Sequence, residues 1–165
     1  MVKRMAIMLF ACFIAMASVT AQQQAQVYNV NANAAEEVAA AVKKAKAEKK
    51  HVLLQIGGNW CSWCLRFNKL VTENDTLHTA MESNYVVVHV NYSKENKNEK
   101  LLASLGYPQR FGFPVFVVLD GNGNRLHTQN SAYLEEGKGH SPAKVLEFFN
   151  HWSPKALDPA SYAGN

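Results

Sequence analysis

The stretch His51-Val52-Leu53-Leu54-Gln55-Ile56-Gly57-Gly58-Asn59-Trp60-Cys61-Ser62-Trp63-Cys64 decides the fold of this 165-residue chain. Its first six residues form a short apolar run, which predicts a buried strand. The two glycines and the asparagine that follow end that strand. Apolar residues then recur at Leu65, Leu70 and Val71, which indicates a helix. The sequence therefore predicts a strand, a turn and a helix, with a Cys-x-x-Cys pair at the junction.

The position of this pair predicts chemistry at its two sulphur atoms. At a helix N-terminus, free N–H groups and the helix dipole stabilise a thiolate, so we expect Cys61 to be the attacking thiol. Cys64 comes one turn later, where its sulphur can attack a mixed disulfide formed on Cys61. The spacing thus predicts an attacking thiol and a resolving thiol.

Two further uses of the pair stay open on these residues. The first is a permanent structural disulfide. The second is a metal site, but zinc would need about four ligands. The six histidines show no H-x3–5-H spacing that would supply the missing ligands, and Leu65 follows Cys64 where a c-type haem signature needs histidine. We expect no metal and no other cofactor.

The rest of the chain continues the alternation of strands and helices. Asn33 and Glu36 read as a capping box before a helix, and Asn74-Asp75 breaks the helix that follows the cysteines. Further elements are expected at about 25–32 (a short edge strand), 76–82 (helix), 85–91 (strand), 94–105 (loop and short helix), 113–119 (strand), 124–128 (antiparallel strand), 129–140 (loop) and 141–153 (helix). This order predicts an α/β fold: a central mixed sheet of about four to five strands with helices on both faces.

The N-terminus resembles a secretory signal peptide. Lys3-Arg4 precedes an apolar stretch that ends near Val19, and small residues before Gln22 suit a cleavage site. An uncleaved membrane anchor, or a lipoprotein acylated at Cys12, is the alternative. We therefore divide the chain into a signal peptide (1–21), an N-terminal extension (22–32), one domain (33–153) and a C-terminal tail (154–165). This division predicts export, to a periplasm if the source is Gram-negative, and leaves Cys61 and Cys64 as the mature cysteines.

Composition and charge restrict the class of protein. The chain is 48% apolar and 18% charged, which suits one folded domain and argues against global disorder. Its net charge of +4 includes Lys3 and Arg4. Without these two residues the basic excess is too small to indicate a nucleic-acid partner.

Taken together, the motifs resemble the thioredoxin superfamily. Trp60-Cys61-Ser62-Trp63-Cys64 matches its W-C-x-x-C active site, and Gly112-Phe113-Pro114 resembles the loop whose cis-proline faces that site. The resemblance covers roughly residues 33–152. The tryptophan at the second variable position of the motif and the helix break at Asn74-Asp75 resemble the corresponding features of exported bacterial thioredoxin-like proteins. Both features are also similar to those of the C-terminal domain of the transmembrane disulfide-reductant conductor.

The resemblance implies an activity and a set of site residues. It implies thiol–disulfide exchange with protein substrates, in a reductase or an isomerase, together with a membrane redox partner. Cys61 and Cys64 would be catalytic, and Pro114 would be the cis-proline. Trp60, Trp63, Phe113 and Pro114 would form the substrate-binding surface. A different class of function stays open, namely a binding module that recognises partners through Trp60 and Phe113 around a permanent disulfide.

Two positions depart from the family pattern. Thioredoxin carries a buried aspartate six residues before the first motif cysteine, whereas this chain carries Gln55, whose amide does not titrate. The inner dipeptide is Ser62-Trp63. We therefore expect either that another group or water handles the proton, or that the redox poise differs.

Overall fold

The computed structural model of this chain describes residues 26–164. Its helices are α1 (Ala34–Glu48), α2 (Ser62–Glu73), α3 (Asp75–Asn84), α4 (Glu99–Ser104) and α5 (Pro142–His151), and its strands are β1 (His51–Gly57), β2 (Tyr85–Asn91), β3 (Val115–Leu119), β4 (Arg125–Asn130), β5 (Glu135–Glu136) and β6 (Gly139–His140).

The first four strands form one mixed sheet in the order β2-β1-β3-β4. β1 pairs with β2 in parallel, while β3 is antiparallel to both β1 and β4. The central strands β1 and β3 are buried along their whole length, which explains why β3 is entirely apolar and β1 mostly so.

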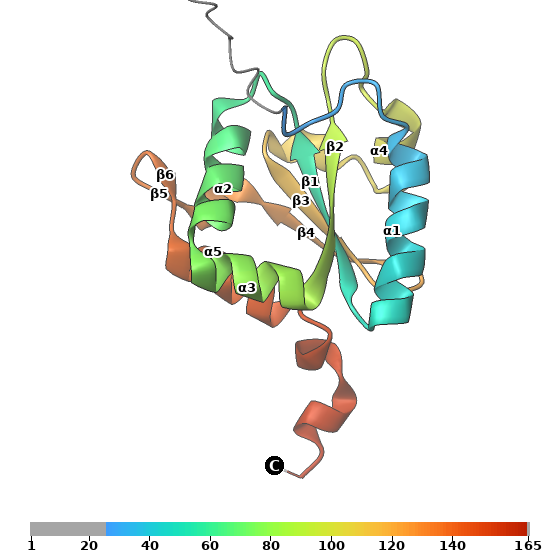
Figure 1. Ribbon diagram of the computed structural model, residues 1–165, viewed down its shortest axis with the longest axis vertical. Helices are drawn as coiled ribbons and strands as arrows, with labels where there is room; N and C mark the ends of the chain where they lie inside the picture. The colour runs from blue at the N-terminus through green and yellow to red at the C-terminus, as the bar shows by residue number, and fades with distance from the viewer. Residues whose placement is uncertain (1–25, 165) are drawn as a thin grey trace, which may run out of the picture.

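Helices cover both faces of this sheet (Figure 1). α1 packs on one face against β1 and β2, and Leu102 of α4 joins the same core. On the other face, residues of α2, α3 and α5 form a second core with β1 and β3. The predicted fold class is confirmed, with four strands in the main sheet.

The helix boundaries arise from local capping. The Asn33 side chain accepts a hydrogen bond of 3.4 Å from the backbone N–H of Glu36, so the predicted start of α1 is confirmed. Asn74 ends α2, and its side chain accepts a hydrogen bond of 3.1 Å from Leu77 at the start of α3. The predicted break at Asn74-Asp75 therefore separates two helices.

The prediction of a short edge strand at about residues 25–32 is wrong over the described part, since residues 26–33 form turns. The physical reason lies at Tyr28, whose backbone N–H and carbonyl both bind the side chain of Asn59 and so cannot pair with a strand. Asn29 also holds a local turn, because its side chain accepts a hydrogen bond of 3.0 Å from Asn31 N–H.

The prediction of a loop over residues 129–140 is also partly wrong. β4 extends to Asn130, a 3-10 helix covers Ser131–Leu134, and β5 and β6 pair as a small antiparallel sheet. The C-terminal tail contains two short 3-10 helices, Lys155–Leu157 and Pro159–Tyr162, and Figure 1 shows it extending beyond α5.

The proposed signal peptide lies outside the described residues, so the division of the chain at residues 21, 32 and 153 stays a prediction. Among the helices of residues 26–164, none is both long and apolar enough to cross a membrane.

Candidate active site

The two cysteines lie where β1 passes into α2. Cys61 is the N-cap of α2, and its sulphur accepts a hydrogen bond of 3.2 Å from the backbone N–H of Cys64. The two residues form a disulfide with an S–S distance of 2.15 Å and a Cα–Cα distance of 5.2 Å. Because the Cys61 sulphur lies at the positive end of the helix dipole, this site favours negative charge on that atom. The predicted position of Cys61 at the helix N-terminus is confirmed.

The two sulphur-bearing residues differ in access, although both are buried. Cys64 lies in the first turn of α2 and is 1% exposed, whereas Cys61 is 6% exposed and adjoins Trp60. Cys61 is thus the slightly more exposed of the two residues.

An exposed aromatic surface borders Cys61. The Trp60 side chain is 60% exposed, and its indole N–H donates a hydrogen bond of 2.7 Å to the carbonyl of Tyr92. The edge of its ring meets Phe113 at a centroid distance of 5.6 Å, and Phe113 packs on Tyr92 at 4.8 Å. A hollow of about 480 Å³ adjoins this surface, lined by Trp60, Tyr92, Ser93, Lys94, Glu95 and Lys97. The hydrogen bond holds an exposed tryptophan in place beside the disulfide.

The loop before β3 brings Phe113 to the same site. The Phe113–Pro114 peptide bond is cis, as expected, and Gly112 before it has a φ of 84°, a conformation that glycine adopts readily. Phe113 packs against the buried cluster of Tyr28, Cys61 and Cys64. The fold therefore unites Trp60, Phe113 and the two cysteines, which are up to 53 positions apart in the numbering of the chain, in one site.

Trp63 lies in a different environment from Trp60. The Arg66 guanidinium carbon lies 4.6 Å from the centre of the Trp63 ring, and Arg66 also donates a hydrogen bond of 2.8 Å to the carbonyl of Lys138. The His140 ring meets Trp63 edge-on at 5.5 Å. Burial lowers the pKa of His140, so its imidazole is neutral at pH 7. Trp63 thus links α2 to the β5–β6 hairpin as well as adjoining the cysteine cluster.

Gln55 occupies a buried position on β1. Its side-chain N–H points to the Met81 sulphur of α3 at 3.8 Å, and its Oε1 atom has no hydrogen-bond partner among the described residues. An amide neither gains nor loses charge near neutral pH, so Gln55 cannot serve as an acid or a base. The structure therefore places a non-titrating side chain in the core behind the active-site helix.

Tyr28 and Asn59 are site residues that the sequence reasoning missed. The Asn59 side chain accepts a hydrogen bond of 3.1 Å from Tyr28 N–H and donates one of 2.7 Å to the Tyr28 carbonyl. These two bonds fasten the N-terminal segment to the loop that carries Trp60 and Cys61. The available signal was an asparagine beside the motif and a single aromatic residue in a polar segment.

Replacing Asn59 with alanine should release the N-terminal segment. Two hydrogen bonds are lost, each worth about 1 kcal/mol, so we expect the free energy of unfolding to fall by about 2 kcal/mol. Amide hydrogen exchange at Tyr28 should accelerate. Asn29→Ala is the matched control, since it removes only a local turn bond. Unchanged protection of Tyr28 in Asn59→Ala would contradict this role.

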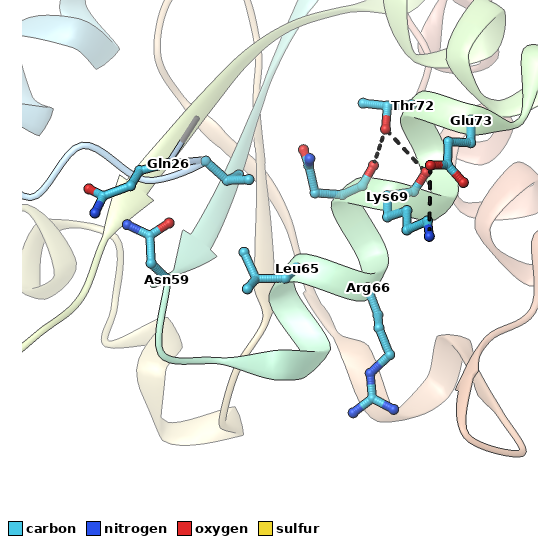
Figure 2. Close-up of a pocket in the computed structure, with 9 residues that line it drawn as sticks. Gln26, Asn59, Leu65, Arg66, Lys69, Thr72 and Glu73 are labelled. Atoms are coloured by element: carbon cyan, nitrogen blue, oxygen red, sulfur yellow. Dashed lines mark hydrogen bonds and ion pairs between the residues drawn. The ribbon is translucent and has the colours of Figure 1, made fainter. Parts of the chain in front are cut away.

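A second hollow, of about 600 Å³, lies between the N-terminal segment and the outer side of α2. Figure 2 shows Leu65, Lys69 and Thr72 of α2 across from Gln26 and Asn59. Neither cysteine lines it, so this hollow is separate from the Cys61–Cys64 disulfide. Within residues 26–164, no group of three or more His, Cys, Asp or Glu side chains is placed to hold a metal ion.

Comparison with known proteins identifies the class of protein that this fold and site define. Residues 32–121 match the family model described as thioredoxin-like. The chain therefore belongs to the thioredoxin-like family. No curated protein matches the chain significantly.

Solved structures of similar fold include redox proteins. The disulphide isomerase from Xylella fastidiosa Temecula1 is 26% identical with a TM-score of 0.67, and the match covers 75% of this chain and 94% of that one. The oxidised C-terminal domain of DsbD from Neisseria meningitidis is 21% identical with a TM-score of 0.53, over 73% of this chain and 97% of that one. A thioredoxin from Thermus thermophilus is 16% identical with a TM-score of 0.53, over 77% and 92%. The family, the fold and the Cys-x-x-Cys pair support a thiol–disulfide oxidoreductase.

Proposed function

We propose that this protein is an exported thiol–disulfide oxidoreductase that acts on protein disulfides through a cycle of Cys61 and Cys64. One observation carries the proposal: the Cys61 sulphur caps α2 and accepts the N–H of Cys64. The same backbone N–H and helix dipole stabilise a thiolate at Cys61 when the disulfide is open.

The cycle proceeds by two exchanges at sulphur. The Cys61 thiolate attacks a substrate disulfide and forms a mixed disulfide, releasing one substrate thiolate. The Cys64 thiolate then attacks the Cys61 sulphur, forms the Cys61–Cys64 bond and releases the second substrate thiolate. Two electrons pass to the substrate, whose sulphur atoms take up two protons. The disulfide found here is the product of that direction, and the reverse sequence oxidises a dithiol substrate.

The substrates are proteins bearing thiols or disulfides. The exposed Trp60 and the partly buried Phe113 form the apolar part of the contact surface, Trp63 adjoins the cysteines, and the cis-proline Pro114 sets the course of the loop that carries Phe113. An apolar surface next to a reactive sulphur suits a segment of an incompletely folded chain, since such segments expose apolar side chains. The similarity to a disulphide isomerase supports a protein substrate.

Export and a membrane redox partner complete the proposal. The signal-like segment at residues 1–21 directs the chain to an exported compartment, which we propose is the periplasm. Disulfides persist there because the compartment is oxidising. An enzyme that reduces substrates in such a place needs electrons from across the membrane, so we propose a membrane-bound dithiol donor as its partner.

The reduction potential of the Cys61–Cys64 pair tests this function. We expect the pair to open and close reversibly against glutathione, with a potential between about −270 and −120 mV. Alkylation of free thiols followed by mass measurement gives the oxidised fraction at each glutathione ratio. A value near −270 mV identifies a reductant, and one near −180 to −120 mV an isomerase or an oxidant. A pair that stays oxidised at every ratio would contradict the proposal and favour a binding module with a permanent disulfide.

A further inference from the structure

Tyr28 carries a buried hydroxyl that nothing so far described uses. Its side chain is 0% exposed, and its hydroxyl has no hydrogen-bond partner among residues 26–164. Leaving a buried polar group unpaired costs free energy, so native proteins seldom do it without a reason. The other fully described buried tyrosine, Tyr85, follows the rule, because its hydroxyl donates a hydrogen bond of 2.7 Å to the carbonyl of Phe149.

The unpaired hydroxyl lies beside the resolving sulphur. Tyr28 belongs to one buried cluster with Cys61 and Cys64. The Tyr28 oxygen and the Cys64 sulphur also converge on Gly57, where an added Cβ would lie 3.1 Å from the former and 2.5 Å from the latter. Glycine at position 57 therefore leaves the space that both atoms occupy.

No hydrogen bond joins the Tyr28 hydroxyl to the Cys64 sulphur in the disulfide form described here, and opening the disulfide changes Cys64 as an acceptor. A sulphur atom in a disulfide is a weak acceptor, and the structure contains the disulfide. A thiolate is a charged acceptor and forms a much stronger hydrogen bond with a neutral hydroxyl. Burial raises the pKa of Tyr28, so its hydroxyl keeps its proton and acts as a donor.

We propose that the Tyr28 hydroxyl donates a hydrogen bond to the Cys64 sulphur once the disulfide opens, and so favours the Cys64 thiolate. The inference rests on the proposed dithiol–disulfide cycle and adds the group that assists its second step. In that step the Cys64 thiol loses its proton, its sulphur bonds to Cys61, and the bond from Cys61 to the substrate breaks. The departing substrate sulphur takes the electron pair and binds a proton from solvent, so the proton count balances.

The groups around this sulphur leave the role to Tyr28. Gln55 on β1 does not titrate. His89 on β2 meets the Tyr28 ring edge-on at 5.4 Å, and burial lowers its pKa, so the imidazole brings no charge at pH 7. His140 on β6, whose pKa burial also lowers, packs on Trp63 and Phe67 of α2. Cys61 also belongs to the cluster, but in the resolving step its sulphur is bonded to the substrate and has no proton to exchange.

The test measures the Cys64 thiol pKa in Tyr28→Phe. Both the variant and its reference carry Cys61→Ser, so that Cys64 is the one thiol left of the pair. The ¹³Cβ shift of labelled cysteine is followed against pH, with the Cys12 signal assigned by Cys12→Ser. Loss of a hydrogen bond to a charged group should raise the Cys64 pKa by about one unit or more. In the protein with both cysteines, resolution of a mixed disulfide at neutral pH should slow about threefold, because the thiolate fraction falls about tenfold while the nucleophilicity of the thiolate rises about threefold.

Tyr85→Phe is the matched control. It removes a hydroxyl that is already paired, so the protein should become less stable in both redox states while the Cys64 pKa stays the same. Tyr28→Phe should show the opposite pattern, with unchanged or higher stability of the oxidised protein and a shifted Cys64 pKa. A purely structural tyrosine would not move that pKa.

Two outcomes would overturn the inference. One is an equal Cys64 pKa in Tyr28→Phe and its reference, in a protein whose wild type cycles against glutathione. The other is an unchanged pKa on incorporating fluorotyrosine at position 28, whose more acidic hydroxyl should lower the Cys64 pKa. The second measurement keeps the test decisive if Tyr28→Phe folds poorly. A wild type that does not cycle would instead refute the proposed function itself.

Discussion

Cys64→Ser should accumulate stable mixed disulfides between Cys61 and protein substrates, whereas Cys61→Ser should accumulate none. The reason lies in the order of the two exchanges. Cys61 caps α2 and attacks first, and without the Cys64 sulphur nothing displaces the substrate from Cys61. Both variants should lose catalysed disulfide exchange almost completely, since each removes one sulphur of the cycle.

The measurement is non-reducing electrophoresis of acid-quenched samples with exported proteins as substrates, followed by identification of the trapped species. Cys12→Ser is the control. Because Cys12 lies in the proposed signal peptide, this substitution should leave trapping and exchange unchanged. Equal trapping by Cys61→Ser and Cys64→Ser would show that the roles assigned to the two sulphur atoms are wrong.

Phe67→Ala should cause the largest loss of stability among substitutions in the active-site helix. Phe67 is 0% exposed. The centre of its ring lies 4.4 Å from the ring centre of Phe116 on β3 and 5.1 Å from that of His140 on β6. Truncation removes the ring and leaves a cavity between α2 and the sheet. We expect the free energy of unfolding to fall by about 3–5 kcal/mol.

Chemical denaturation of the oxidised protein measures this loss, with the disulfide intact in every sample so that its contribution is constant. Leu65→Ala is the matched control on the same helix. Leu65 is 36% exposed, and its truncation should change stability by about 0.5 kcal/mol or less. A loss below about 1 kcal/mol in Phe67→Ala would mean that other contacts hold α2 on the sheet.

The predictable part of this protein is local in sequence. Asn33 and Asn74 indicated helix starts because a cap bonds the backbone only three residues away. The same reasoning located Cys61 at the start of α2. The order of strands and helices then restricted the fold to a mixed sheet covered on both faces.

Other features depend on contacts that no local pattern reveals. Residues 26–33 contain strand-forming valines, yet they form turns because the Asn59 side chain takes both backbone groups of Tyr28. Likewise, β5 and β6 are too short to predict, and Arg66 of α2 binds Lys138 between them. In each case the partner is at least 31 residues away, and local pattern carries no information about which distant side chain will bind.

The sequence alone determined where the two cysteines lie and which chemistry they predict, because the strand, turn and helix around them are local in the chain and a thiol at a helix N-terminus is activated by its own helix. It also determined the family resemblance through W-C-x-x-C and Phe113-Pro114. Tertiary structure alone decided what surrounds the sulphur atoms. Only folding brings Phe113 onto Trp60 and buries the Tyr28 hydroxyl beside Cys64. These residues are far apart in the chain, so bringing them together costs loop-closure entropy, which is offset only when the whole sheet and its helices have packed.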